Sequence, residues 1–111
     1  MPTAFDPITG QEVDTSSEAW RHSCECRWLL ANKPTRSQKH LHLYGVEDRA
    51  KLFRFDTRTG RQELRDDVSS LWPEDDRGRT IKPLMAWRGL EAADRILADA
   101  RRLYELAQAK N

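Results

Sequence analysis

The chain has 111 residues and a formal net charge of +1, with 38% hydrophobic and 33% charged residues. This length and composition allow one domain with a small core, to which four tryptophans contribute large side chains. The charge excludes a strongly basic polyelectrolyte or an acidic tail, and no apolar run approaches the roughly 20 residues of a membrane span.

The N-terminal sequence M-P-T-A-F-D-P lacks the positive and the apolar segments of a secretory signal peptide. We therefore expect the protein to be in the cytoplasm and not in a membrane. In that reducing compartment Cys24 and Cys26 are expected to be free thiols rather than a disulfide.

Residues 1–14 contain no helical period and are predicted to be an irregular lead-in. Within them, Phe5-Asp6-Pro7-Ile8-Thr9-Gly10 is typical of a turn. The same pattern, F-D-x-x-T-G, recurs at residues 55–60. The flanking sequences differ, which favours repeated turn chemistry over a duplicated domain. Both copies are expected to close short hairpins.

A first helix is predicted to follow the capping box Thr15-x-x-Glu18 and to end at Asn32-Lys33-Pro34. One stripe of this helix is apolar at helical spacing and is expected to be buried. The stripe comprises Trp20, Cys24, Trp28 and Ala31. Cys26 lies about 200° around the helix from Cys24, so Cys26→Ala is expected to be milder than Cys24→Ala if Cys26 faces outward.

A second helix is predicted to start at the capping box of residues 35–38 and to weaken at Gly45. Residues 46–58 fit either a short strand or a continued helix. We favour the strand or an irregular segment, in which Phe53 and Phe55 would share one face.

A third helix is predicted over residues 59–72, from a further capping box and helical spacing of apolar residues. Residues 73–82 have the composition of a linker. A long C-terminal helix over residues 83–110 begins near Pro83. Its alanines recur every seven residues at Ala86, Ala93, Ala100 and Ala107. This seam favours close packing on another helix of the chain, with a homodimer as the alternative.

These elements predict a mostly α single domain over residues 1–111, with four helices and one or two short β-hairpins or turns. Its parts are the lead-in 1–14, helices one to three in 15–72, the linker 73–82 and the helix 83–110. The predicted core comprises Trp20, Cys24, Trp28, Leu64, Val68, Leu71, Ile96, Leu97 and Leu103.

Five side chains are of types that bind zinc: His22, Cys24, Cys26, His40 and His42. Only His22 and Cys26 share a helix face, because residues two apart point about 200° away from each other. Two ligands are half a zinc site, so we predict no metal and no cofactor. His22 and Cys26 are also a possible base and nucleophile, but no glycine-rich elbow or oxyanion loop accompanies them. We therefore predict no catalytic residues and no enzymatic activity.

Residues 33–65 carry nine basic and four acidic side chains, a balance of +5, and are the only strongly charged segment. We predict that this segment binds a partner, with solvated surface charge as the alternative. The candidate partner-binding residues are Lys33, Arg36, Lys39, Arg54, Arg58, Arg61 and Arg65. Such a cluster could also contact phosphates, although no helix-turn-helix or RNA-binding aromatic motif accompanies it.

Several short motifs occur in residues 10–72. They are Gly10-x-x-Val-Asp14, Ser17-Glu-Ala-Trp20-Arg-His22-x-Cys24-Glu25, then Arg27, Leu30 and Pro34-Thr35, and later Val46-Glu47 and Leu64 to Leu71-Trp72. This pattern resembles a group of small phage- and prophage-encoded proteins in which a W-R-H-E-C-E-A-R helix follows a G-x-x-V-D-S lead-in. The chain departs from the group at Ser23, at Cys26 and in an insertion over residues 51–58. The departure at Cys26 argues against an essential thiol pair.

The resemblance implies a phage context, and hence the cytoplasm of a host cell, without a settled activity. We therefore expect a non-enzymatic, phage-encoded accessory protein that acts by binding another protein. A host-defence inhibitor, for example of a CRISPR effector, and a virion or assembly component both fit. The alternative is a nucleic-acid-binding protein that uses residues 33–65.

Overall fold

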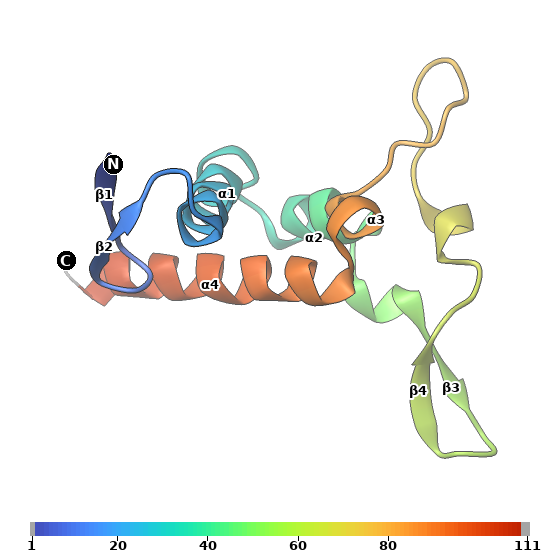
Figure 1. Cartoon of the computed structure of the whole chain (residues 1–111). Coiled ribbons are helices and arrows are strands. Elements are labelled where there is room, and N and C mark those ends of the chain that lie inside the picture. The colour runs from blue at the N-terminus through green and yellow to red at the C-terminus, as the bar shows by residue number, and fades with distance from the viewer. Residues whose placement is uncertain (1, 110–111) are drawn as a thin grey trace. The chain divides into compact units, whose positions relative to one another are not determined.

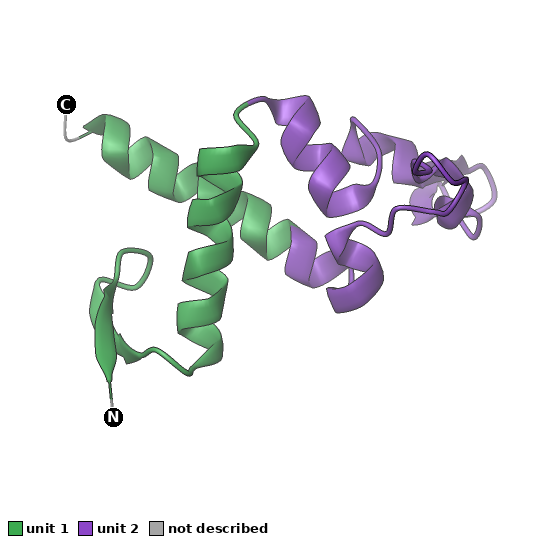
Figure 2. Ribbon diagram, turned by 90° about the horizontal axis from the view of Figure 1, so that it is seen from above, with its two compact units in different colours: residues 1–34, 94–111 green, residues 35–93 purple. Residues whose placement is uncertain are grey.

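The computed structural model describes residues 2–109 and divides the chain into two compact units (Figure 2). Unit 1 is formed by residues 1–34 with 94–111, and unit 2 by residues 35–93. The α-helices and β-strands are labelled in Figure 1. In chain order the elements are β1 (Thr3–Asp6), β2 (Gln11–Asp14), α1 (Glu18–Asn32), α2 (Arg36–Tyr44), η1 (Arg49–Leu52), β3 (Phe53–Asp56), β4 (Arg61–Leu64), η2 (Val68–Leu71), α3 (Leu84–Arg88) and α4 (Leu90–Ala109). The helix α4 starts in unit 2 and continues in unit 1 from Asp94.

The prediction of a mostly α fold is wrong, because the described chain combines four α-helices with two antiparallel sheets of two strands each. Strand β1 pairs with β2, and β3 pairs with β4. The fold class is therefore mixed α and β. The hairpins lie at the two F-D-x-x-T-G sequences, where hairpins were expected, and residues 3–14 of the predicted irregular or turn lead-in form the first of them.

The two hairpin turns have the same hydrogen bonds. In each, the aspartate Oδ1 accepts the N–H two residues later, at 2.9 Å for Asp6 and 2.8 Å for Asp56. The aspartate carbonyl accepts the N–H of the turn glycine, Gly10 or Gly60, at 2.8 and 2.9 Å. These glycines have φ angles of +73° and +70°, which glycine adopts without strain. The repeated sequence therefore encodes a repeated turn.

Capping side chains fix the starts of α1 and α2. The Ser17 Oγ accepts the Trp20 N–H at 3.2 Å, so α1 begins after Ser17 and not after Thr15. The predicted capping box of α2 is present, with Thr35 and Gln38 each accepting the backbone N–H of the other. Both helices end where the sequence predicts.

The predicted buried face of α1 is wrong. Ser23, Cys26 and Leu29 are buried, whereas Cys24 is exposed and the Trp28 residue is 47% exposed. The helix carries apolar residues on two faces, so spacing alone does not select the buried one. The side chains that are buried are small or slender, whereas both tryptophans of the predicted stripe remain at the surface or half-buried.

The core of unit 1 lies where α1 meets α4. Ile96 and Ala100 of α4 are buried, and the Cys26 thiol contacts the Ile96 carbonyl at 3.6 Å. The prediction that Ile96 is buried is confirmed. Leu97 and Leu103, also predicted to be in the core, are only half-buried.

The core of unit 2 centres on the end of α2 and the residues that follow it. Its fully or nearly fully buried apolar residues are Leu43, Tyr44, Val46, Leu52, Ala92 and Ala93. The predicted core members Leu64, Val68 and Leu71 are exposed or half-buried. The predicted core of this unit was therefore placed in residues 64–71, whereas the buried apolar residues lie in residues 43–52 and 92–93.

The predicted third helix over residues 59–72 is absent. Gly60 closes the second hairpin turn, residues 61–64 form β4, and only the short 3₁₀ helix η2 follows. The apparent capping box at residues 59–62 thus belongs to a hairpin, because the preceding Asp56 anchors the turn. The local pattern of a helix start and of this turn overlap.

The predicted helix over residues 83–110 is two helices. Pro83 precedes α3, and Gly89, with φ +86° and ψ 162°, ends that helix before α4 begins. The predicted end at Lys110 lies outside the described residues. The predicted linker 73–82 has no helix, and its isolated bridge joins Glu74 to Thr80.

Candidate functional site

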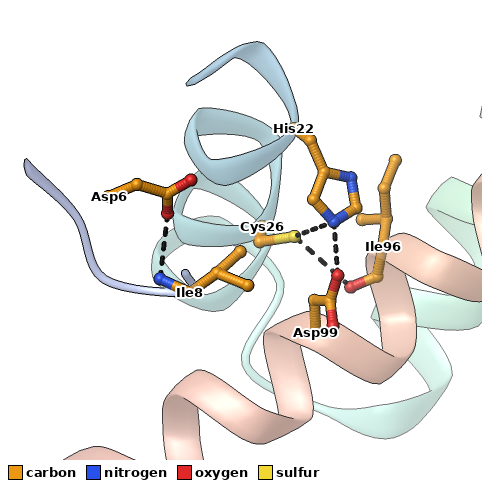
Figure 3. A network of polar contacts seen from close by, with 6 residues as sticks. All are labelled: Asp6, Ile8, His22, Cys26, Ile96 and Asp99. Atoms are coloured by element: carbon orange, nitrogen blue, oxygen red, sulfur yellow. Dashed lines mark hydrogen bonds and ion pairs between the residues drawn. The ribbon is translucent and has the colours of Figure 1, made fainter. Parts of the chain in front are cut away.

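Three chemically active side chains meet between α1 and α4 in unit 1 (Figure 3). The His22 Nε2 atom lies 2.5 Å from the Asp99 Oδ2 atom and 3.7 Å from the Cys26 Sγ atom. The thiol also donates to the Ile96 carbonyl at 3.6 Å. His22 and Cys26 were recognised in the sequence as a possible pair, but Asp99 was not, because it lies 77 residues away.

This group has the composition of a cysteine, histidine and carboxylate triad but not its geometry. In a triad the nucleophile and the carboxylate contact opposite nitrogens of the imidazole, so that one nitrogen takes the proton while the other is held. Here both Cys26 and Asp99 face the same Nε2 atom of His22. The histidine cannot accept the thiol proton at the atom already bound to Asp99.

The environment of Cys26 also keeps its thiol protonated. The residue has no exposed surface. Burial, with the nearby charge of Asp99 and smaller effects of Glu25 and Asp6, raises the pKa of Cys26 to about 12. A thiol with this pKa is a weak nucleophile near neutral pH. The hydrogen bonds of His22, Cys26 and Asp99 therefore hold α1 against α4 and do not activate the cysteine.

We expect a large difference in reactivity between the two thiols. Iodoacetamide applied to the native protein near pH 8 should label the exposed Cys24 and leave Cys26 unlabelled, as mass spectrometry would show. Cys24→Ser should abolish native labelling, and denaturant should restore one label. Rapid labelling of Cys26 in the native protein would show that the thiol is accessible and ionised, contrary to this structure.

The same geometry disfavours a metal. Ligand atoms around a tetrahedral zinc ion, bonded at about 2.0 Å, lie roughly 3.3 Å apart. The His22 Nε2 and Asp99 Oδ2 atoms are 2.5 Å apart, a direct hydrogen bond. Across residues 2–109, no group of three or more His, Cys, Asp or Glu residues is arranged to hold a metal ion.

His40 is a buried histidine in unit 2. Its Nδ1 atom accepts the backbone N–H of Arg49 at 2.9 Å, and its ring lies edge-on to Tyr44 at 5.4 Å between centroids. Burial, followed by the positive charge of Arg36, lowers the pKa of His40. The neutral imidazole thus fixes the start of η1 against α2, which is a structural role.

The depressed pKa of His40 predicts how stability depends on pH. The unfolded chain takes up the His40 proton first, near pH 6.5, so the contribution is complete above that pH and is lost as pH falls through and below it. We expect the free energy of unfolding to fall more steeply between about pH 7 and 5 in the wild type than in His40→Asn, whose side-chain oxygen can still accept the Arg49 N–H. Equal slopes in urea titrations would show that His40 is not buried as a neutral ring.

The seven predicted basic residues are divided between the two units. Lys33 belongs to unit 1 and the other six to unit 2. Three of the arginines form ion pairs with nearby carboxylates. These pairs are Arg36–Asp48, Arg54–Asp66 and Arg65–Asp67, with N–O distances of 3.5, 3.8 and 2.9 Å. Part of the +5 balance is therefore neutralised within the protein, two of the partner carboxylates lying just beyond residue 65.

The β3–β4 hairpin retains unpaired basic residues. Arg58 and Arg61 are exposed and make no ion pair with any residue that the structure describes. Phe55, on the same hairpin, is 62% exposed. This hairpin is the part of the predicted basic segment that remains available for a partner.

A groove of about 280 Å³ lies in unit 2, and its lining is largely apolar. The end of α2, the segment after it, η1, η2 and Pro73 contribute the lining residues. They are Leu41, Gly45, Val46, Glu47, Lys51, Leu71 and Pro73. Glu47 and Lys51 are exposed and place one charge of each sign at an apolar surface. Most of the lining side chains are apolar, so the composition of the groove suits the binding of an apolar group.

Gly45 lines the groove and packs against the Trp72 indole. The residue ends α2 with φ +75°, and a side chain there would meet the Trp72 indole, because its Cβ position lies 2.3 Å from Trp72 Cδ1. The Trp72 Nε1 atom is buried without a hydrogen-bond partner among the residues of the described chain. Sequence patterns did not reveal the groove, because nothing local indicates that residues 41–51 meet residues 71–73.

Residues 13–53 match the profile of a protein family described as a family of unknown function (DUF7696). The match includes α1, α2 and η1, and it contains five residues of the groove, namely Leu41, Gly45, Val46, Glu47 and Lys51. No curated protein and no solved structure matches the chain. Among residues 2–109, no helix has both the length and the apolar composition that a membrane span requires.

Proposed function

We propose that this chain is a non-enzymatic protein-binding module and that its groove in unit 2 receives an apolar segment of the partner. The groove carries the proposal, since it combines an apolar lining with one acidic and one basic side chain. Leu41 supports it, because this α2 leucine lines the groove and is still 40% exposed. An apolar partner side chain would cover that surface.

The same proposal includes the biological setting suggested by the sequence resemblance. A phage-encoded accessory protein in the host cytoplasm can act by occupying a surface of a host or phage complex. Such an action needs shape and charge complementarity rather than an active site. Inhibition of a host defence complex and assembly of the virion remain the two candidate outcomes of that binding.

Affinity purification from a nuclease-treated host lysate tests the proposal. Wild-type protein should retain a stoichiometric amount of a partner protein. Leu41→Asp should retain at least tenfold less, because binding would bury the new carboxylate without a counter-charge. Leu106→Asp is the matched control, since Leu106 is 43% exposed on α4 and should bind like the wild type. Equal retention by both variants would contradict a role for the groove.

Nucleic-acid binding is a second candidate, favoured by the unpaired Arg58 and Arg61 beside the exposed Phe55. Phosphates would pair with the arginines while the ring stacks on a base. In that case, generic DNA or RNA should bind at low salt and lose affinity steeply at moderate salt. Replacement of Arg36, Lys39, Arg58 and Arg61 should weaken this binding further. Recovery of nuclease-sensitive nucleic acid, without a protein partner, from a parallel lysate not treated with nuclease would favour this candidate over the groove.

A further inference from the structure

The β1–β2 and β3–β4 hairpins repeat one arrangement of exposed groups. Each places a phenylalanine directly before the turn aspartate, and Phe5 and Phe55 are both 62% exposed. Exposed aromatic rings at equivalent positions of two hairpins are not required by the turn, whose hydrogen bonds involve the aspartate and glycine. The repeated phenylalanine therefore needs a separate explanation.

Each hairpin also leaves its strand edges open. Both sheets contain two strands and no third strand within residues 2–109. An isolated two-stranded hairpin is marginally stable in water, and further strands or packing against a helix are needed for independent stability. Open edges accept an additional strand through backbone hydrogen bonds. The hairpins are thus suited to edge-to-edge pairing.

The phenylalanines lie on faces that an added strand could extend. Cross-strand partners share a face, so Phe55 lies with Gln62 and with the Phe53 and Leu64 pair two residues away. Leu64 is 41% exposed. A sheet that continued this face would cover apolar surface now in contact with water.

In the first hairpin, Phe5 pairs with Glu12 and shares its face with Thr3 and Asp14. The opposite face carries the buried Asp6. The face that bears Phe5 is therefore the solvent face of the hairpin, and acidic groups surround its single apolar side chain.

The two hairpins differ in charge. The first carries three acidic residues, Asp6, Glu12 and Asp14, and no basic residue. The second carries three arginines, at positions 54, 58 and 61, and two acidic residues. Asp6 and Asp56 are engaged by their own turn amides. Two copies of the same hairpin would not complement each other in charge, whereas the first and the second would.

We propose that the β1–β2 hairpin of one copy pairs edge to edge with the β3–β4 hairpin of a second copy. The joined sheet would have four strands, with Phe5 and Phe55 on one face and acidic residues beside arginines. Because each copy has one hairpin of each kind, the contact is head to tail and can add further copies. The occupant of the open edge is therefore this chain itself.

Sedimentation velocity over a range of protein concentrations tests this contact. Wild-type protein should grow in average mass with concentration. Phe5→Ser and Phe55→Ser should each be monomeric alone, with association weakened at least tenfold. Mixed in equal amounts, they should form a 1:1 dimer that grows no further, since one variant keeps the first hairpin and the other keeps the second. Tyr104→Ser, at a 56% exposed position on α4, should associate like the wild type.

Both phenylalanines are exposed, so circular dichroism and urea titration should show that the two variants are folded. High salt should weaken the mixed dimer several-fold, because the exposed charges are screened. The proposal is overturned by a wild type that stays monomeric at every concentration. It is equally overturned by single variants that still self-associate, or by a mixture of folded variants that forms no dimer.

Discussion

Gly45→Ala is expected to destabilise unit 2 by about 2–5 kcal/mol. Two effects add in this variant. The φ of +75° is unfavourable for alanine, and the new Cβ would lie 2.3 Å from Trp72 Cδ1, so the indole must move. Urea denaturation followed by circular dichroism and tryptophan fluorescence measures the loss.

Gly60→Ala separates the two effects. Its φ is +70°, close to that of Gly45, but no atom lies within 4 Å of the new Cβ position. This control should lose only the conformational term, about 1–2 kcal/mol. If both variants lost the same stability, the indole of Trp72 would not be packed on Gly45, and the floor of the groove would differ from the structure.

Ile96→Asp is expected to unfold unit 1 or to destabilise it by about 4 kcal/mol or more. Ile96 is 1% exposed in the contact between α1 and α4, where the His22 imidazole is already bound by Asp99. The variant therefore combines a lost apolar side chain with a buried charge. Chemical denaturation monitored by circular dichroism gives the change in the free energy of unfolding.

Leu97→Asp is the adjacent control. Leu97 is half-buried, so its aspartate can reach water, and the expected loss is about 1 kcal/mol. The reverse order, with Leu97→Asp more damaging than Ile96→Asp, would show that α4 packs with a different face. The comparison of the two variants thus tests directly which face of α4 is buried.

Local chemistry made part of the fold predictable. The helix α2 follows from a capping box and a terminal glycine, and both hairpins follow from the F-D-x-x-T-G sequence. In these segments the residues that decide the structure are neighbours in the chain. The prediction of a helix over residues 59–72 was wrong because one local pattern fits two structures. A threonine and a glutamine three residues apart occur both in capping boxes and in this hairpin turn.

Long-range packing made the rest unpredictable. The helix α1 has apolar residues on two faces, and only the approach of α4 selects Cys26 and Leu29 for burial. The same contact brings Asp99 to His22 across 77 residues of sequence. Gly89 separates α3 from α4 because its positive φ is not helical. The sequence could not show this, since a single glycine is tolerated within many helices.

Of the candidate sites, the sequence indicated the His22 and Cys26 pair and the charges of the second hairpin, but not the groove. Arg58 and Arg61 were identified from composition and remain exposed, but the ion partners of Arg65 and Arg54 lie just beyond the basic segment. The groove joins Leu41 to Leu71 and Pro73, which no periodicity connects. Composition therefore indicated the sign of a surface, whereas the shape of the binding site required tertiary structure.

Site-specific photo-crosslinking tests the proposed groove most directly. A benzophenone amino acid would replace Leu41 in one protein and Leu106 in another, and each would be irradiated in a nuclease-treated host lysate. Both positions are similarly exposed, at 40% and 43%. Binding through the groove predicts one discrete protein adduct at position 41 and none at position 106. Equal adducts at both positions, or no adduct at position 41, would contradict the proposed function.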